Sequence, residues 1–380
     1  MKKSPLLFLV FSLITIGLVF ISISSLTEAN STIGDKFFFL KKQSLWLLIS
    51  LVCFYITSKI KISFIKKFSF TLYIMTLVLL LLVLVPGLSN ETLGARRWLN
   101  LGFINIQPTE ILKFTSIIYF SYLFSIKEKR TIKNLILYLS IPFALIILEP
   151  NLSTAILISV IIISIYYLSG GEIISLFKLC TVAVALSILL IIFSPYRFAR
   201  LKTLLSPKTE QNTTSYHSNQ IILALSSGGL FGKGFANSDQ KYQYLPKIST
   251  DSILAVIGEE MGFFGIVLIL LIYVYLITYL IKLSQIIPDP FQSLLISSVA
   301  CWIAYQSLIN ISAIVAIIPL TGVPLPFISY GGSSLLTLLS AIGLVRNIEK
   351  QNNLLIYSNG ENKGIAKENH HHRHPLNSRR

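Results

Sequence analysis

Charged residues are scarce in this sequence, and acidic residues are the scarcest. Only 13% of the 380 residues are charged, whereas 53% are hydrophobic, and lysine plus arginine outnumber aspartate plus glutamate by 32 to 16. Apolar runs recur along almost the whole chain. Helices that are apolar on every face have no stable way to pack in water, which argues against one large soluble core. The composition therefore excludes an ordinary soluble domain and predicts an integral membrane protein.

Cysteine is rare as well, and its placement excludes a disulfide framework. Cys53, Cys180 and Cys301 all fall within apolar stretches and are odd in number. Histidines occur at 370–372 and 374, where they can bind a metal weakly. They belong to the polar segment Gln351–Arg380, which has the composition of a disordered, solvated tail.

The apolar runs predict about ten transmembrane helices, some of which borrow flanking residues to cross roughly 30 Å of hydrocarbon. The first run follows Lys2 and Lys3 like a signal peptide, but it lacks a clear cleavage site and is long enough to span. The fold class is thus an all-α membrane domain over residues 1–350, followed by a tail over 351–380. The runs are Pro5–Leu26, Leu45–Thr57, Phe68–Val85, Pro108–Phe124, Leu135–Leu148, Leu152–Leu168, Leu176–Phe193, Ser252–Leu283, Phe291–Ile318 and Ser333–Val345.

Basic residues indicate the orientation of these helices. If ten helices alternate, most basic clusters fall on one side, and the positive-inside rule makes that side and both termini cytoplasmic. Two loops on the outer side are nevertheless basic: the loop with Arg96 and Arg97, and the long loop over 197–251 between helices seven and eight. Outer positive charge predicts an anion-binding surface and argues against a nucleic-acid partner. The cytoplasmic set is Lys2, Lys3, Lys59, Lys61, Lys66, Lys67, Lys127, Lys129, Arg130, Lys133, Lys178, Lys282, Arg346 and Lys350.

The segment Tyr216–Gly265 is the most informative part of the chain. It is polar, basic and rich in glycine, and its acidic residue Asp251 directly precedes an apolar run. Loops longer than about 12–15 residues are usually functional or disordered, and tyrosines and leucines here argue against disorder. Glycines at 228, 229, 232 and 234 permit close approach to a substrate, although a flexible hinge explains them equally well.

Ionisable residues at membrane depth are costly and often mark functional pathways. Glu149 lies between the fifth and sixth runs, and Glu259 and Glu260 lie inside the eighth. The last two are consecutive, so they point about 100° apart and at most one faces a given cavity. An interhelical hydrogen bond or a helix cap explains Glu149 and Glu260 as well as a functional cavity does.

Two further segments cannot be regular spans. Leu320–Ser334 contains two prolines and three glycines, so it is predicted to be a turn or a re-entrant piece. Irregular backbone at this depth must be buried in protein or line a wet cavity. Gly94–Glu110 is predicted to be an aromatic-rich loop, with Pro108 starting the next helix. Arg96 and Arg97 can contact either a bound anion or phospholipid headgroups.

Four stretches resemble the SEDS family (shape, elongation, division and sporulation) of membrane proteins. They are GARRWLNLGF…QPTEILK at 94–113, EPNLSTA at 149–155, SSGGLFGKGFANSDQKYQYLP…TDSILAVIGEEMGFFG at 226–265, and PLPFISYGGSSLL at 324–336. Together they extend from the third predicted helix to the tenth. The string at Asn237–Pro246 is more similar to the division branch, FtsW, than to the elongation branch, RodA.

The resemblance implies a peptidoglycan glycosyltransferase that polymerises lipid II on the outer face of the plasma membrane, at the division site. It also implies a class B penicillin-binding protein and other division proteins as partners, beside lipid II, the glycan strand and membrane lipids. The family's essential loop acid corresponds to Asp251. A wall-retaining plastid is an alternative location to a bacterial membrane.

Three positions depart from the family's pattern. The usual Thr-Asp-Phe reads Thr-Asp-Ser, with Ser252, and the usual Pro-Ser-Glu reads Pro-Thr-Glu at Pro108–Glu110. The usual Pro-Asp-x-Gly-Thr reads Pro-Asn-Leu-Ser-Thr at Pro150–Thr154. The last change removes a carboxylate at Asn151, which leaves Asp251 as the stronger acid candidate.

The chemistry of such a transfer fits a single acid. A sugar hydroxyl attacks an anomeric carbon in an inverting displacement, and the departing polyprenyl pyrophosphate needs charge neutralisation rather than a general acid. Asp251 then serves as the general base, in contrast to the carboxyl pair of glycoside hydrolases. No cofactor is required, although Mg²⁺ or Mn²⁺ can share the neutralisation. Predicted substrate-binding residues are Arg96, Arg97, Lys113, Lys233, Lys241, Gly229 and Gly232, and candidate polar residues of a cavity are Glu110, Glu149, Glu260 and Ser329.

Two other functions remain open. A lipid II flippase is compatible with a ten-helix body, but it should place polar groups along a route through the bilayer, and no such route is traceable in the sequence. A noncatalytic scaffold of a division complex would give Asp251 no role.

Overall fold

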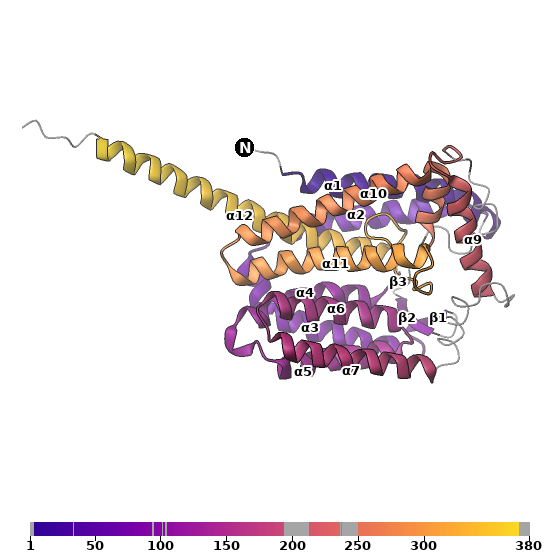
Figure 1. Ribbon diagram of the computed structural model, residues 1–380, viewed down its shortest axis with the longest axis horizontal. Helices are drawn as coiled ribbons and strands as arrows, with labels where there is room; N and C mark the ends of the chain where they lie inside the picture. Colours follow the sequence, from indigo (N-terminus) through magenta and orange to yellow (C-terminus); the bar gives the residue numbers. More distant parts are fainter. Residues whose placement is uncertain are drawn as a thin grey trace, which may run out of the picture.

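The computed structural model describes residues 4–32, 34–92, 95–100, 102, 105–193, 213–235, 237 and 250–371, and these are mostly helical (Figure 1). The helices lie side by side, and α12 continues beyond the body of the bundle. They are α1 (Leu6–Thr32), α2 (Phe38–Thr57), α3 (Ile62–Leu84), α4 (Pro108–Ser125), η1 (Lys127–Lys129), α5 (Ile132–Leu148), α6 (Leu152–Leu168), α7 (Ile173–Ile192), α9 (Thr213–Gly228), α10 (Ile253–Ile286), α11 (Pro290–Ile314) and α12 (Gly332–His371).

Within the described residues, five helices are long and apolar enough to cross a membrane: α1, α2, α3, α10 and α11. The apolar helices α5 and α6 are shorter. Large apolar side chains are exposed on the outside of α2, α3 and α10, for example Leu48, Met75 and Leu271. Such surfaces are stable against hydrocarbon and not against water. The predicted membrane class therefore accounts for the surface as well as for the helix lengths.

Helix α4 is the centre of the bundle. It packs against α3, α6, α11 and α12, and most of its side chains are buried, including the polar ones Glu110 and Lys113. Pro108 occupies its first turn, as the sequence predicts, because a proline there sacrifices no helical hydrogen bond. Any polar group on α4 must therefore find its partners inside the protein.

Three expectations from the sequence need correction. The segment Gly94–Glu110 is not simply a loop: β1 (Ser89–Thr92), β2 (Ala95–Asn100) and β3 (Asn105–Ile106) form an antiparallel sheet in the order β1-β2-β3. The predicted long loop contains the helix α9. Helix α12 runs to His371, through most of the segment predicted to be disordered. The pairing of the strands and the packing of α9 against α10 depend on distant partners, which local composition does not reveal.

The irregular segment between α11 and α12 is largely buried in protein, which is one of the two alternatives that the sequence left open. Residues Leu325–Ser329 are all buried. Its backbone is bonded to helices α10 and α2: Tyr273 of α10 donates its hydroxyl to the Pro326 carbonyl, and Gln43 of α2 accepts from the Gly331 amide at 3.3 Å. Helix α1 approaches so closely that a β-carbon at Gly17 would lie 2.5 Å from the Ile328 carbonyl oxygen. Protein partners thus satisfy a non-helical backbone at this depth.

Candidate functional site

Asp251 lies immediately before α10, with its side chain half-buried. The N-cap position of α10 belongs to the next residue, Ser252, which is fully buried. The Asp251 carboxylate faces the segment after α11: its Oδ2 would be 3.6 Å from a β-carbon at Gly322. Gly322 itself is exposed. The absence of a side chain at Gly322 therefore leaves space beside the carboxylate.

Asn310 of α11 connects the two backbones around Asp251. Its Nδ2 donates to the Val323 carbonyl at 2.8 Å and to the Asp251 carbonyl at 3.4 Å. The Asn310 side chain is buried, so its amide is a fixed donor to both carbonyls. This amide holds the start of α10 and the segment after α11 in one arrangement.

A buried ion pair lies next to this arrangement. Lys113 Nζ is 2.7 Å from Glu110 Oε2, and both side chains are almost fully buried. The same Nζ donates to Gln306 Oε1 at 3.0 Å, an oxygen that also accepts from Trp302 Nε1 at 2.7 Å. Gln306 Nε2 donates in turn to the Pro324 carbonyl at 2.9 Å. These contacts connect α4 through α11 to Pro324, which follows Val323 in the sequence.

Two adjacent carbonyls beside Asp251 are therefore held by one face of α11. Gln306 bonds Pro324, and Asn310 bonds Val323 and Asp251. Sequence reasoning missed both amides. The signal that would have found them is the spacing of Trp302, Gln306 and Asn310, which recur every fourth residue in an apolar run and so share a helix face.

Arg97 and Glu149, singled out separately from the sequence, lie together. Arg97 on β2 donates Nε to the Glu149 carbonyl at 3.3 Å and Nη2 to the Pro150 carbonyl at 2.5 Å. Its planar fork thus holds the turn between α5 and α6. Arg96 precedes Arg97 on the strand and pairs with Glu91 of β1, and Arg97 is the extra residue of a β-bulge between the Trp98 and Arg96 pairs.

The Glu149 carboxyl group is unusual among the described residues. It is 1% exposed, and neither carboxyl oxygen has a hydrogen-bond partner within the described part of the chain. Burial raises the pKa of Glu149 to about 8, against the lowering effect of the Arg97 guanidinium. Burial thus disfavours the charged form of this carboxyl group.

The glycine-rich segment after α9 packs backbone to backbone against a break in α10. The break is at Gly262, with φ 68° and ψ −164°. Phe263 and Phe264 donate their amides to the carbonyls of Gly229 and Leu230, at 3.0 and 3.2 Å. A β-carbon at Gly232 would lie 2.1 Å from the Glu260 carbonyl oxygen. The backbone at Gly232 therefore makes its close approach to α10 of the same protein.

Lys233 is tied to the same region. Its Nζ lies 2.9 Å from Glu259 Oε1, and the Glu259 side chain is fully buried. Ser227 donates its hydroxyl to the same oxygen at 3.2 Å. The neighbouring candidate Glu260 is also buried, and its carbonyl accepts from the Gly234 amide at 3.1 Å. The pairing of Lys233 with Glu259 helps to hold the glycine-rich segment against α10.

The remaining predicted residues divide into two kinds. Ser329 is buried and accepts from the Leu325 amide at 2.9 Å, which stabilises the segment between α11 and α12. Lys241 lies outside the described residues, as does most of 197–249. Among the residues that are described, no cluster of three or more histidine, cysteine, aspartate or glutamate side chains could hold a metal ion.

A matched pair of glycine substitutions tests the packing of this segment. Gly232→Ala is expected to destabilise the fold by about 1–3 kcal/mol more than Gly229→Ala. Both glycines have positive φ, 82° and 56°, so both alanines carry the conformational cost, but only a β-carbon at Gly232 meets backbone atoms. The measurement is equilibrium unfolding in mixed micelles. Equal losses in the two variants would contradict the close contact with Glu260.

A family model described as FTSW_RODA_SPOVE, cell cycle protein, matches residues 4–354. The chain is 34% identical over 353 residues to the probable peptidoglycan glycosyltransferase FtsW of Wigglesworthia glossinidia brevipalpis, covering 90% of this chain and 91% of that protein. It is 33% identical over 349 residues to the protein of the same name from Coxiella burnetii, covering 89% and 93%.

Solved structures share the fold. A chain from the work described as "Structural coordination of polymerization and crosslinking by a peptidoglycan synthase complex" superimposes with a TM-score of 0.74 at 24% identity, covering 91% of this chain and 97% of that one. The rod shape determining protein RodA of Thermus thermophilus gives a TM-score of 0.68 at 24% identity, covering 92% and 97%. At these identities the likeness concerns the arrangement of helices.

Proposed function

Because this chain belongs to the FTSW_RODA_SPOVE family of cell cycle proteins, we propose that it is a peptidoglycan glycosyltransferase that polymerises lipid II during cell division. The observation that carries this proposal is the similarity, over about nine tenths of both chains, to relatives named probable peptidoglycan glycosyltransferase FtsW. It is a multi-pass membrane protein, as its apolar helices require.

Asp251 is the proposed general base. It is half-buried, beside the open space at Gly322, and its backbone is held by Asn310. A half-buried carboxylate on a backbone that is held in place can accept the proton of an attacking sugar hydroxyl. The displacement inverts the anomeric carbon, because the hydroxyl attacks opposite the departing pyrophosphate.

The leaving pyrophosphate requires positive charge. Arg96, Lys233 and Lys241 are proposed to supply it, with Mg²⁺ or Mn²⁺ able to share the work. Arg97 contributes by holding the turn at Glu149 and Pro150. Lys113 contributes through Gln306, which holds the Pro324 carbonyl in the segment after α11.

The proposed topology has ten spans with both termini in the cytoplasm, which places residues 197–251 outside. The proposed location of the protein is the plasma membrane at the division site. The basic clusters on alternating connections support this orientation. A class B penicillin-binding protein is the proposed partner. Its support is the fold shared with a chain from a structure described as a peptidoglycan synthase complex that couples polymerization and crosslinking.

The flippase alternative predicts a polar route across the bundle. Buried polar side chains do line α4 and α11, but the charged ones, Glu110 and Lys113, are confined to the first two turns of α4 and are paired with each other. Farther along, the contact between the two helices is a hydroxyl pair, Ser121 with Ser298 at 3.2 Å. This arrangement favours the polymerase over a transport route.

The test uses purified full-length protein and purified lipid II, with and without a class B transpeptidase. Glycan strands resolved by gel electrophoresis are the expected product. Movement of labelled lipid II across vesicle bilayers without any strand formation would overturn the proposal in favour of the flippase. If the protein binds its transpeptidase but yields neither polymer nor movement of lipid II, the result would favour the scaffold.

A further inference from the structure

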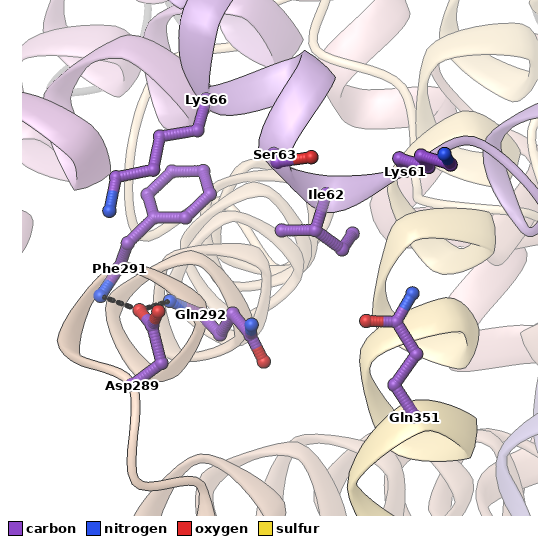
Figure 2. A pocket seen from close by; sticks show the side chains of 8 residues that line it. All are labelled: Lys61, Ile62, Ser63, Lys66, Asp289, Phe291, Gln292 and Gln351. Carbon is purple, nitrogen blue, oxygen red and sulfur yellow. Dashed lines mark hydrogen bonds between the residues drawn. The ribbon is translucent and has the colours of Figure 1, made fainter.

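A second polar site lies at the opposite end of the bundle from Asp251. Asp251 precedes the first residue of α10, whereas Asp289 follows its last residue, so the length of a 34-residue helix separates them. Beside Asp289 is a pocket of about 400 Å³, formed by the starts of α3 and α11 and by α12 (Figure 2). Its lining residues are Lys61, Ile62, Ser63, Lys66, Asp289, Phe291, Gln292 and Gln351.

The charges of the pocket favour a singly charged anion. Lys61 and Lys66 contribute two positive charges and Asp289 one negative charge. The Asp289 carboxylate is already used as the N-cap of α11, where Oδ1 accepts from the amides of Phe291 and Gln292 at 2.8 and 3.2 Å. The charged lining residues therefore leave the pocket with one net positive charge to neutralise.

The start of α3 adds to this preference. Its N-cap residue is Lys61, which makes no side-chain cap and carries no acceptor with which to make one. The first-turn amides and the positive end of the helix dipole therefore favour an anion there. Lys66 is half-buried, with Nζ 5.8 Å from the ring centroids of Tyr122 and Phe291, and so is directed by packing rather than free in solvent.

The surroundings of the pocket are apolar on the membrane side. Phe64 and Phe68 are exposed on one face of α3, three and seven residues after Lys61, and their ring centroids are 4.5 Å apart. Rings in this position can contact acyl chains while the lysines contact a headgroup. Basic pockets between transmembrane helices are a known setting for anionic headgroups.

We propose that this pocket binds the phosphodiester headgroup of an anionic phospholipid. Lys61 and Lys66 contact the phosphate, Ser63, Gln292 and Gln351 supply polar groups around it, and the acyl chains lie along Phe64 and Phe68. The single charge of a phosphodiester matches the single net charge of the pocket. Bound lipid would join α3, α11 and α12 at the end of the bundle that carries the basic clusters.

The experiment measures lipid retention by native mass spectrometry of the full-length protein in neutral detergent, titrated with phosphatidylglycerol or phosphatidylcholine. Each of Lys61→Ala and Lys66→Ala is expected to weaken phosphatidylglycerol binding about fivefold. The matched control is Lys67→Ala, which removes the same charge from the same helix outside the pocket lining. It should retain the preference for phosphatidylglycerol.

Two further arms keep the proposal open to contradiction. Gln351→Glu adds a negative charge to the pocket without removing a lysine, so it should also weaken binding. Glycerol 1-phosphate tests for a soluble ligand: displacement of the lipid at millimolar concentration would assign the site to a soluble phosphate compound instead. An equal loss in Lys67→Ala and Lys66→Ala would also overturn the proposal, because it would indicate diffuse surface charge.

Discussion

Replacing Asp251 with asparagine is expected to lower the rate of lipid II polymerisation by about 10²–10⁴-fold while the protein remains folded and binds lipid II. Asparagine keeps the size of the side chain and one oxygen, but it cannot accept the proton of the attacking hydroxyl. The backbone contact from Asn310 to the Asp251 carbonyl does not depend on the side chain. The loss should therefore appear in turnover and not in stability.

A structural role for Asp251 gives a different outcome. In that role the acid only caps the start of the helix. Such a cap is worth about 0.5–2 kcal/mol, and asparagine caps equally well. In this structure the N-cap position belongs to Ser252. A folded Asp251→Asn protein that polymerises at a near-normal rate would remove Asp251 from the mechanism and favour the flippase.

The matched control for this substitution is Asp35→Asn. Asp35 is an exposed acid in the connection between α1 and α2 that pairs with Lys41 at 2.9 Å. The Phe37 amide donates to Asp35 Oδ1 at 3.0 Å, and asparagine retains an oxygen that can accept this hydrogen bond. Exposed ion pairs are worth about 0–1 kcal/mol, so this variant should polymerise normally. Equal losses in both variants would indicate a general effect of removing negative charge.

Removing the ammonium group of Lys113 is expected to produce the largest loss of stability. Lys113→Met leaves the Glu110 carboxylate buried without its 2.7 Å partner and removes one donor from Gln306. Breaking a buried pair in this way costs about 3–5 kcal/mol. The measurement is the free energy of unfolding in mixed micelles, with Lys41→Met, at an exposed pair, as the control expected to change little.

The double variant Glu110→Gln/Lys113→Met separates stability from substrate binding. Replacing both partners of a buried pair often restores stability, so most of the loss should be recovered, and lipid II should bind normally. A stable double variant that no longer binds lipid II would show that Lys113 contacts the substrate itself. A double variant as unstable as Lys113→Met would contradict the pairing as the cause.

Local sequence was sufficient for features that depend on nearby residues. The apolar runs identified the membrane class, because hydrocarbon selects continuous helices, and Pro108 marked the start of α4, because its missing amide is harmless there. The prolines and glycines of Leu320–Ser334 correctly excluded a regular span. The position of Asp251 between a polar segment and an apolar helix could also be read directly.

Contacts between distant residues decided the rest. The sequence marked Glu149 and Glu259 as costly groups, since an unpaired polar group is expensive in hydrocarbon. It marked Arg97 and Lys113 as candidate substrate-binding residues. It did not reveal that Arg97 holds the Glu149 turn or that Lys113 reaches Gln306. Those pairings join residues 52 and 193 positions apart. Only the packing of whole helices brings such groups within hydrogen-bond distance, because the energy of each contact depends on both partners being held in place.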